Sequence, residues 1–311
     1  MAVAVKPFKF GVQSRGVGPR DAWLASLRRI EALGYSSVSW ADHFLSGLDP
    51  LASLAAAAIA TERLRLTSFV LDNDFRHPVV VAMAAGTIDI LSGGRLELGI
   101  GAGWMKPEYT RSGIPFDPPG VRIARLEESL QLLTLLFTGE PVTFQGAFYQ
   151  VDGLVLPPVP VQRPRPPFVI GGGSRKILTL AGKYADIVGI TNRALPDGAK
   201  DLEDLTAEAM ERKVGWVRDG AGARFPDIEL NMICGRVVVT DDREAAAAQL
   251  AGQLPLSVEQ ILDAPAILIG SVDEIVATLK ARRERFGVSN IVIVEPMMEA
   301  FAPVVAQLAG R

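Results

Sequence analysis

Short apolar runs alternate with amphipathic segments along the whole chain. In the first amphipathic segment, apolar residues recur at helical spacing from Trp23 to Leu33, and we expect Asp21 to cap that helix. The apolar runs are each short enough to be one strand, and nearly continuous apolar strands are typical of a parallel sheet buried on both faces. Eight such strands are predicted: Phe8–Gln13, Ser37–Trp40, Arg65–Leu71, Arg95–Ile100, Phe168–Ile170, Asp186–Ile190, Ile228–Val239 and Asn290–Val294.

Eight strands alternating with helices favour an α/β fold of the (β/α)8 TIM-barrel class, with one domain over residues 1–311. The alternative is a doubly wound open sheet, which usually carries a glycine fingerprint for a dinucleotide after its first strand. The segment Gln13–Gly18 does not have that pattern. An insertion is expected at about residues 138–167, where the proline-rich stretch Thr143–Pro167 predicts a small hairpin followed by an extended crossing segment.

The amino-acid composition limits the kinds of partner and the cellular compartment that we expect. The 311 residues include 32 Lys and Arg and 35 Asp and Glu, a formal net charge of -3, which disfavours a nucleic acid or an anionic membrane as partner. The single cysteine, Cys234, cannot form an intramolecular disulfide, and no apolar run reaches membrane-spanning length. The start of the chain does not resemble a signal peptide. We therefore expect a cytoplasmic enzyme that acts on a small molecule.

The active site of such a barrel lies at the carboxyl ends of its strands. Asp42 and His43 follow the second predicted strand, and an imidazole can exchange a proton near neutral pH. The alternative for His43 is a loop imidazole bonded to backbone. The only other histidine, His77, precedes Pro78 at an expected helix start, so a capping role is predicted for it.

Two glycine-rich stretches also fall at strand ends. Gly99–Trp104 follows the fourth strand, where missing side chains would let a ring or a phosphate approach the backbone. Gly171–Lys176 ends the next strand and opens a helix, so free N–H groups, a hydroxyl and two cations predict an anion site. The alternative for both stretches is a tight turn with solvated charges. No metal site is expected.

These motifs, read in order, resemble the luciferase-like monooxygenase superfamily. The resemblance rests on Trp40–His43, Arg76–Pro78, Leu91–Trp104, Gly113–Phe116 and Ile170–Ser174, and is closest to the actinobacterial oxidoreductases that use the deazaflavin F420. It implies a TIM barrel with an insertion, a homodimer, and a non-prolyl cis peptide bond in the third strand, here Phe69–Val70. Phe69 stands where relatives often carry a small residue.

The resemblance also implies the site residues. It places Asp42 and His43 beside the cofactor ring as the catalytic pair. The residues that it implies for binding the cofactor are Trp40, Phe69, Val70, Gly101, Ala102, Gly103, Trp104, Gly171, Gly172, Gly173, Ser174 and Arg175. Sugar-phosphate dehydrogenases of the superfamily carry a glutamate where this chain has Trp104, which disfavours that substrate class. Trp104 followed by Glu108 and Tyr109 resembles the general branch of reductases.

The function expected from this resemblance is hydride transfer between C5 of F420 and a small organic substrate. His43 would donate or accept a proton, oriented by Asp42. One alternative is an FMN-dependent monooxygenase that uses reduced FMN and O2, supplied by a separate flavin reductase. Another is a non-catalytic flavin-binding protein. The substrate is not encoded, although the loops Met105–Gly120 and Leu195–Lys200 and the insertion would shape its pocket.

Overall fold

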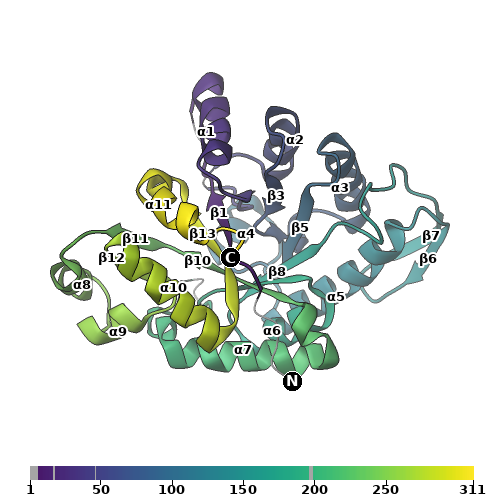
Figure 1. The fold of residues 1–311 in the computed structure, drawn as a ribbon. Coiled ribbons are helices and arrows are strands. Elements are labelled where there is room, and N and C mark those ends of the chain that lie inside the picture. Colours follow the sequence, from purple (N-terminus) through teal and green to yellow (C-terminus); the bar gives the residue numbers. More distant parts are fainter. Residues whose placement is uncertain (1–5, 17, 46, 196–198) are drawn as a thin grey trace.

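Eight parallel strands form a closed barrel surrounded by helices (Figure 1). The structure is a computed structural model that describes residues 6–16, 18–45, 47–195 and 199–311. Every neighbouring pair in the ring is parallel, and the pairing of β3 with β5 closes it. The barrel strands are β1 (Lys9–Gln13), β2 (Ser37–Trp40), β3 (Arg65–Ser68), β5 (Leu96–Gly101), β8 (Phe168–Gly172), β9 (Ile187–Ile190), β10 (Glu229–Cys234) and β13 (Val288–Val294). The predicted TIM barrel is confirmed.

One helix follows each barrel strand and covers its outer face. These helices are α1 (Arg20–Ala32), α2 (Pro50–Ala60), α3 (Pro78–Leu91), α5 (Pro119–Leu136), α6 (Arg175–Tyr184), α7 (Ala207–Ala221), α10 (Val272–Phe286) and α11 (Met298–Leu308). Pro50 and Pro78 each stand at the first helical position, as expected, because proline loses no hydrogen bond there. Asp21, by contrast, does not cap α1. It lies in the first turn of the helix, after Pro19.

The expected insertion contains an antiparallel hairpin, β6 (Val142–Gln145) and β7 (Gln150–Leu154), which lies beside α5 at the edge of the molecule in Figure 1. The segment after it crosses α3. There the backbone N–H of Gln162 donates to Oδ2 of Asp89 (2.9 Å), and its amide Nε2 donates to Oδ1 (2.7 Å). Because Asp89 is fully buried, this pair of bonds fixes the crossing segment without any strand pairing.

A second excursion separates β10 from α10. The predicted strand Ile228–Val239 is in fact two strands, β10 and β11 (Arg236–Val239). β11 leaves the barrel and pairs with β12 (Ile267–Gly270), with α8 (Arg243–Ala251) and α9 (Val258–Asp263) between them. β12 was not predicted. No helix within the described ranges is long and apolar enough to cross a membrane.

Helices α6 and α7 pack backbone against backbone because glycines face the contact. A Cβ on Gly220 of α7 would overlap the carbonyl oxygen of Thr179 in α6, and one on Gly182 of α6 would overlap that of Val217. Gly215, also in α7, has no atom within 4 Å of the position that its Cβ would take. This close contact fixes the position of α6, whose first residue follows the glycine-rich end of β8.

The two glycines of α7 should therefore respond in opposite directions to the same substitution. Gly215→Ala should stabilise the protein by about 0.5–1 kcal/mol, because alanine loses less conformational entropy in a helix. Gly220→Ala should lower stability by roughly 1–3 kcal/mol, because the added methyl separates α6 from α7. Urea denaturation of both variants checks this. Equal effects of the two substitutions would show that the interhelical contact carries no steric constraint.

Candidate active site

His43 lies just beyond β2, at the carboxyl end of the barrel, and its partner is Glu108 rather than Asp42. The Nδ1 atom of His43 is 2.9 Å from Oε2 of Glu108. Glu108 belongs to the short helix α4 (Lys106–Ser112), and its side chain is 2% exposed, against 22% for that of His43. Its other oxygen accepts the backbone N–H of Leu45 (3.3 Å). One buried carboxylate thus contacts both the imidazole and the loop that carries it.

Asp42 has a structural role in this arrangement. Its carboxylate accepts two N–H groups of Arg76, at 2.5 and 3.1 Å, and the backbone N–H of Asp72 at 3.0 Å. Asp42 thus bonds to Arg76 and Asp72, whereas the ring of His43 bonds to Glu108. The prediction that Asp42 orients His43 is therefore wrong.

Trp104 forms one wall beside His43. The two rings meet edge to face, with centroids 5.8 Å apart. The ammonium of Lys200 lies 4.2 Å from the Trp104 ring and donates a long bond to the carbonyl of Asn192 (3.4 Å). Burial, with a smaller contribution from the ammonium of Lys213, lowers the pKa of Lys200 to about 8. Part of the expected pocket loop Leu195–Lys200, residues 196–198, lies outside the described residues.

The Phe69–Val70 peptide bond is cis, as the resemblance implied. It separates β3 from the two-residue strand β4 (Leu71–Asp72). Phe69 is buried and packs with Val169 and Ile187, so its side chain fills the barrel rather than a cofactor surface. Val70 is partly exposed, and its methyl groups lie against the glycines of two neighbouring strands. A Cβ on Gly101 would come within 2.8 Å of Val70 Cγ2, and one on Gly171 within 3.5 Å of Cγ1.

The glycine-rich stretch after β8 is only partly a turn. Gly171 and Gly172 belong to β8 itself, and a Cβ on Gly172 would overlap the side chain of Ile177. A Cβ on Gly173 would lie 2.5 Å from the backbone nitrogen of Arg193, so its lack of a side chain serves packing against the next loop. Packing against Ile177 therefore accounts for the lack of a side chain at Gly172, and its role in holding an anion stays a prediction.

The start of α6 retains the features of an anion site. Ser174 is the N-cap residue, but its side chain makes no capping bond to the helix, so the hydroxyl is not used for that purpose. Arg175 and Lys176 follow it and are exposed. The first N–H groups of any helix have no partner within the helix, and they favour an anion.

Behind the Gly101–Trp104 stretch lies a buried polar cluster. Arg122 donates to the carbonyls of Ala102 (3.1 Å) and Gly103 (2.6 Å). The hydroxyl of Tyr109 is 2.7 and 2.8 Å from the two carboxylate oxygens of Asp72, and burial raises the pKa of Asp72 to about 7. A Cβ on Gly103 would overlap this hydroxyl. Packing therefore accounts for Gly103, and the backbone carbonyls here face Arg122.

Trp40 is not at the site. Its side chain is 1% exposed and packs against Trp23 of α1, with ring centroids 6.1 Å apart. It belongs to the core between β2 and α1, so its predicted contact with a cofactor is wrong. His77, as expected, is the N-cap of α3, where its Nδ1 accepts the N–H of Val79 (3.2 Å).

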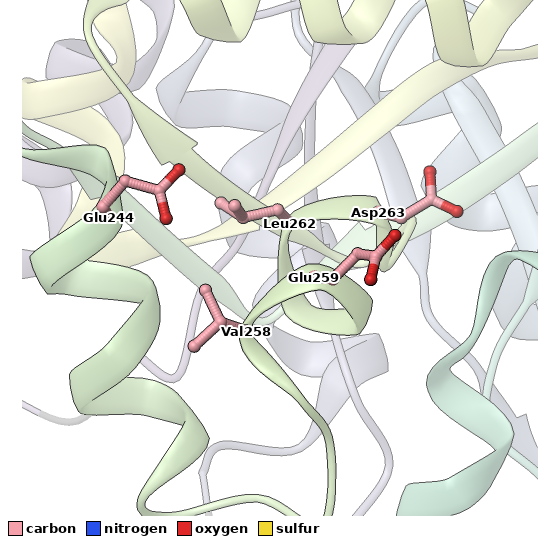
Figure 2. A pocket seen from close by; sticks show the side chains of 5 residues that line it. All are labelled: Glu244, Val258, Glu259, Leu262 and Asp263. Carbon is pink, nitrogen blue, oxygen red and sulfur yellow. The ribbon is translucent and has the colours of Figure 1, made fainter.

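A wide hollow of about 530 Å³ opens elsewhere, between α8 and α9. Figure 2 shows the carboxylate side chains of Glu244, Glu259 and Asp263 around the apolar side chains of Val258 and Leu262. Three carboxylates repel a phosphate, and none of the residues at the carboxyl end of the barrel lines this hollow. We therefore place the chemistry at the barrel end. Within the described residues no group of His, Cys, Asp and Glu side chains is arranged to hold a metal ion.

Sequence reasoning missed the contacts of Glu108 and Lys200. Glu108 had a usable signal, since a carboxylate four residues after Trp104 can lie at the same end of the barrel. Lys200 had none, because its approach to Trp104 depends on the path of a loop. The structure gathers two groups of predicted residues: His43 with Trp104, and Val70 with Gly101 and Gly171.

Comparisons with known proteins agree with this fold and show the family. The family model for luciferase-like monooxygenases matches residues 4–266. The chain is 34% identical over 255 residues to an F420-dependent glucose-6-phosphate dehydrogenase of Kribbella flavida, covering 77% of this chain and 71% of that protein. It is 30% identical over 195 residues to an FMNH2-dependent dimethylsulfone monooxygenase of Pseudomonas putida, covering 61% of this chain and 53%, about half, of that protein.

A solved structure shares the fold over nearly the whole chain. The coenzyme F420-dependent tetrahydromethanopterin reductase of Methanopyrus kandleri superposes with a TM-score of 0.76 over 97% of this chain and 98% of that one. The sequences are 18% identical, so the likeness concerns the barrel alone.

Asp72 should make stability depend on pH. Its pKa in the folded state, about 7, lies above the ordinary value of 3.8, so the folded state binds the proton more tightly. Its contribution to stability is therefore fully present below about pH 4 and is lost as pH rises to about 7. Asp72→Asn should remove this fall, on the order of 2–4 kcal/mol, in urea denaturation between those pH values.

Tyr109→Phe tests the same assignment by raising the pKa of Asp72 further instead of removing the titrating group. The Tyr109 hydroxyl lowers the pKa of Asp72, so its removal should extend the fall in stability to higher pH. If the wild type and Asp72→Asn had the same pH dependence, Asp72 would not be the group responsible.

Proposed function

Because the chain belongs to the luciferase-like monooxygenase family, we propose that it is an F420-dependent oxidoreductase. It would transfer a hydride between C5 of the deazaflavin and a small organic substrate. The observation that carries the proposal is a histidine paired with a buried carboxylate at the mouth of a barrel whose strand ends are lined with glycine. Relatives named as F420-dependent dehydrogenases support the choice of cofactor.

The described residues fit a flavin-type cofactor. At the ends of β5 and β8, Gly101 and Gly171 leave Val70 as the side chain that a flat ring would meet. At the start of α6, the hydroxyl of Ser174, which makes no capping bond, and the cation of Arg175 suit a phosphate. When bound, F420 would supply a carbon centre that gives or accepts a hydride, and the protein positions ring and substrate.

His43 would move the proton that accompanies the hydride. Nδ1 is occupied by Glu108, so Nε2 is the nitrogen left to serve the substrate. Trp104 packs against the imidazole and shields one side of it from water. A shielded imidazole with one nitrogen free can act as a general acid or base.

The alternative is an FMN-dependent monooxygenase, and the relative from Pseudomonas putida is the observation in its favour. That reading would require O2 and reduced FMN from a separate reductase. A non-catalytic flavin-binding protein is disfavoured by the buried carboxylate that contacts His43, since binding alone requires no proton transfer.

We also propose a cytoplasmic homodimer without nucleic-acid or membrane partners, in keeping with the family resemblance and the net charge of -3.

F420 should bind at least tenfold more tightly than FMN, a difference of about 1.4 kcal/mol. Titration of the protein with each cofactor, oxidised and reduced, followed by fluorescence and absorbance, measures both constants. Equal or tighter binding of FMN would overturn the cofactor choice and favour the monooxygenase.

His43→Ala should reduce turnover by roughly 10²–10⁴-fold while changing cofactor affinity far less, because it removes a proton-transfer group. His77→Asn is the matched control. Asparagine caps helices well, so this variant should keep both turnover and the start of α3. Near-normal turnover of His43→Ala in steady-state assays would leave His43 as an ordinary loop histidine.

A further inference from the structure

In the part of the chain that the structure describes, the carboxylate of Glu108 is buried beside an imidazole and not beside a permanently charged lysine or arginine. Its side chain is 2% exposed, yet within the described residues its one ion-pair partner is His43. A buried carboxylate without a permanent cation is costly, since the charge loses its hydration. Its two oxygens are both used, one by the imidazole and one by the backbone N–H of Leu45.

A tether for the loop after β2 would not need this charge. A neutral amide oxygen can accept the N–H of Leu45 as well as a carboxylate oxygen can, at a lower cost of burial. What the carboxylate adds is a group that only accepts hydrogen bonds. Facing it, Nδ1 of His43 must carry the proton, and Nε2 is left bare in the neutral ring.

We propose that Glu108 is the positioning residue of His43: it fixes the imidazole in the Nδ1–H form and presents an unprotonated Nε2 to the substrate. This proposal rests on the proposed function only for the transfer of a proton between Nε2 and the substrate. The assignment of the proton to Nδ1 follows from the contacts alone.

Glu108→Gln gives a specific expectation. The N–H of Leu45 can only donate, so it holds the oxygen of the new amide. The NH2 group then faces His43, and Nδ1 has to accept a hydrogen bond from it. The substitution should therefore move the proton of the neutral ring from Nδ1 to Nε2 while the tether to Leu45 is kept.

The chain contains two histidines, which makes the measurement simple. Long-range proton–nitrogen correlation NMR of the histidine-labelled protein, well above the ordinary titration range of imidazole, reports which nitrogen carries the proton. His77 serves as an internal reference, because its Nδ1 accepts the N–H of Val79 and its proton must lie on Nε2. The wild type should show one ring of each form.

In Glu108→Gln both rings should show the Nε2–H form, with the signals of His77 unchanged. Asp42→Asn is the matched control, because it alters a buried carboxylate next to His43 in sequence that bonds to Arg76 instead. It should lower stability and leave His43 in the Nδ1–H form. An Nε2–H form of His43 in the wild type, or no change in Glu108→Gln, would overturn the proposal. The wild-type spectrum decides even if the variant does not fold.

The kinetic readout links the tautomer to catalysis. Glu108→Gln should lower kcat by roughly 10²–10⁴-fold with little change in cofactor affinity, as expected for an imidazole with its proton on the wrong nitrogen. A changed tautomer with unchanged turnover would overturn the link to catalysis and the proton-transfer role of His43. Absence of F420 turnover in the wild type would reject the proposed function and leave the NMR result standing.

Discussion

The carboxylate of Asp42 holds the carboxyl end of the barrel together beside the cis peptide bond that separates β3 from β4. It bonds at once to the guanidinium of Arg76 and to the backbone N–H of Asp72, and so joins the ends of β2 and β4. Arg76 also reaches Asp49 at the start of α2 (2.8 Å). A bidentate, largely buried pair of this kind is strongly directional. Asp42 is engaged in these contacts, whereas His43 contacts Glu108 of α4. The shape of the site follows from the separate partners of these two adjacent residues.

The sequence predicted the architecture better than the contacts within the site. Periodicity located all eight barrel strands because buried parallel strands are apolar throughout, whereas β12 was missed because it follows two short helices in an excursion outside the barrel. The prediction that Asp42 orients His43 came from the family resemblance, which places these two adjacent residues as a pair beside the cofactor ring. Glu108 is 65 positions away, and closure of the barrel brings it to the imidazole. That contact depends on how the closed barrel places α4 beside the loop after β2.

The glycine-rich stretch after β8 also shows that a local sequence pattern does not reveal the contacts of its residues. A run of three glycines after a strand indicated an anion site, but Gly172 faces Ile177 and Gly173 faces the backbone at Arg193, so packing accounts for both. The hydroxyl of Ser174 and the start of α6 keep the chemistry that the prediction requires. Similarly, Trp40 occurs in a motif beside His43, yet the alternation of side chains along β2 directs it into the core against Trp23. The types of these residues suggested a role in cofactor binding, but their positions in the strands and turns show that they serve packing.

Val70 occupies space that a side chain on Gly101 would otherwise need, because a Cβ there would lie 2.8 Å from Val70 Cγ2. The two positions share one small volume although they come from separate strands of the barrel. A larger residue at position 101 is therefore accommodated only where residue 70 becomes smaller. In the evolutionary record of such barrels, these positions should therefore vary together, and a residue transplanted singly between relatives should fit poorly.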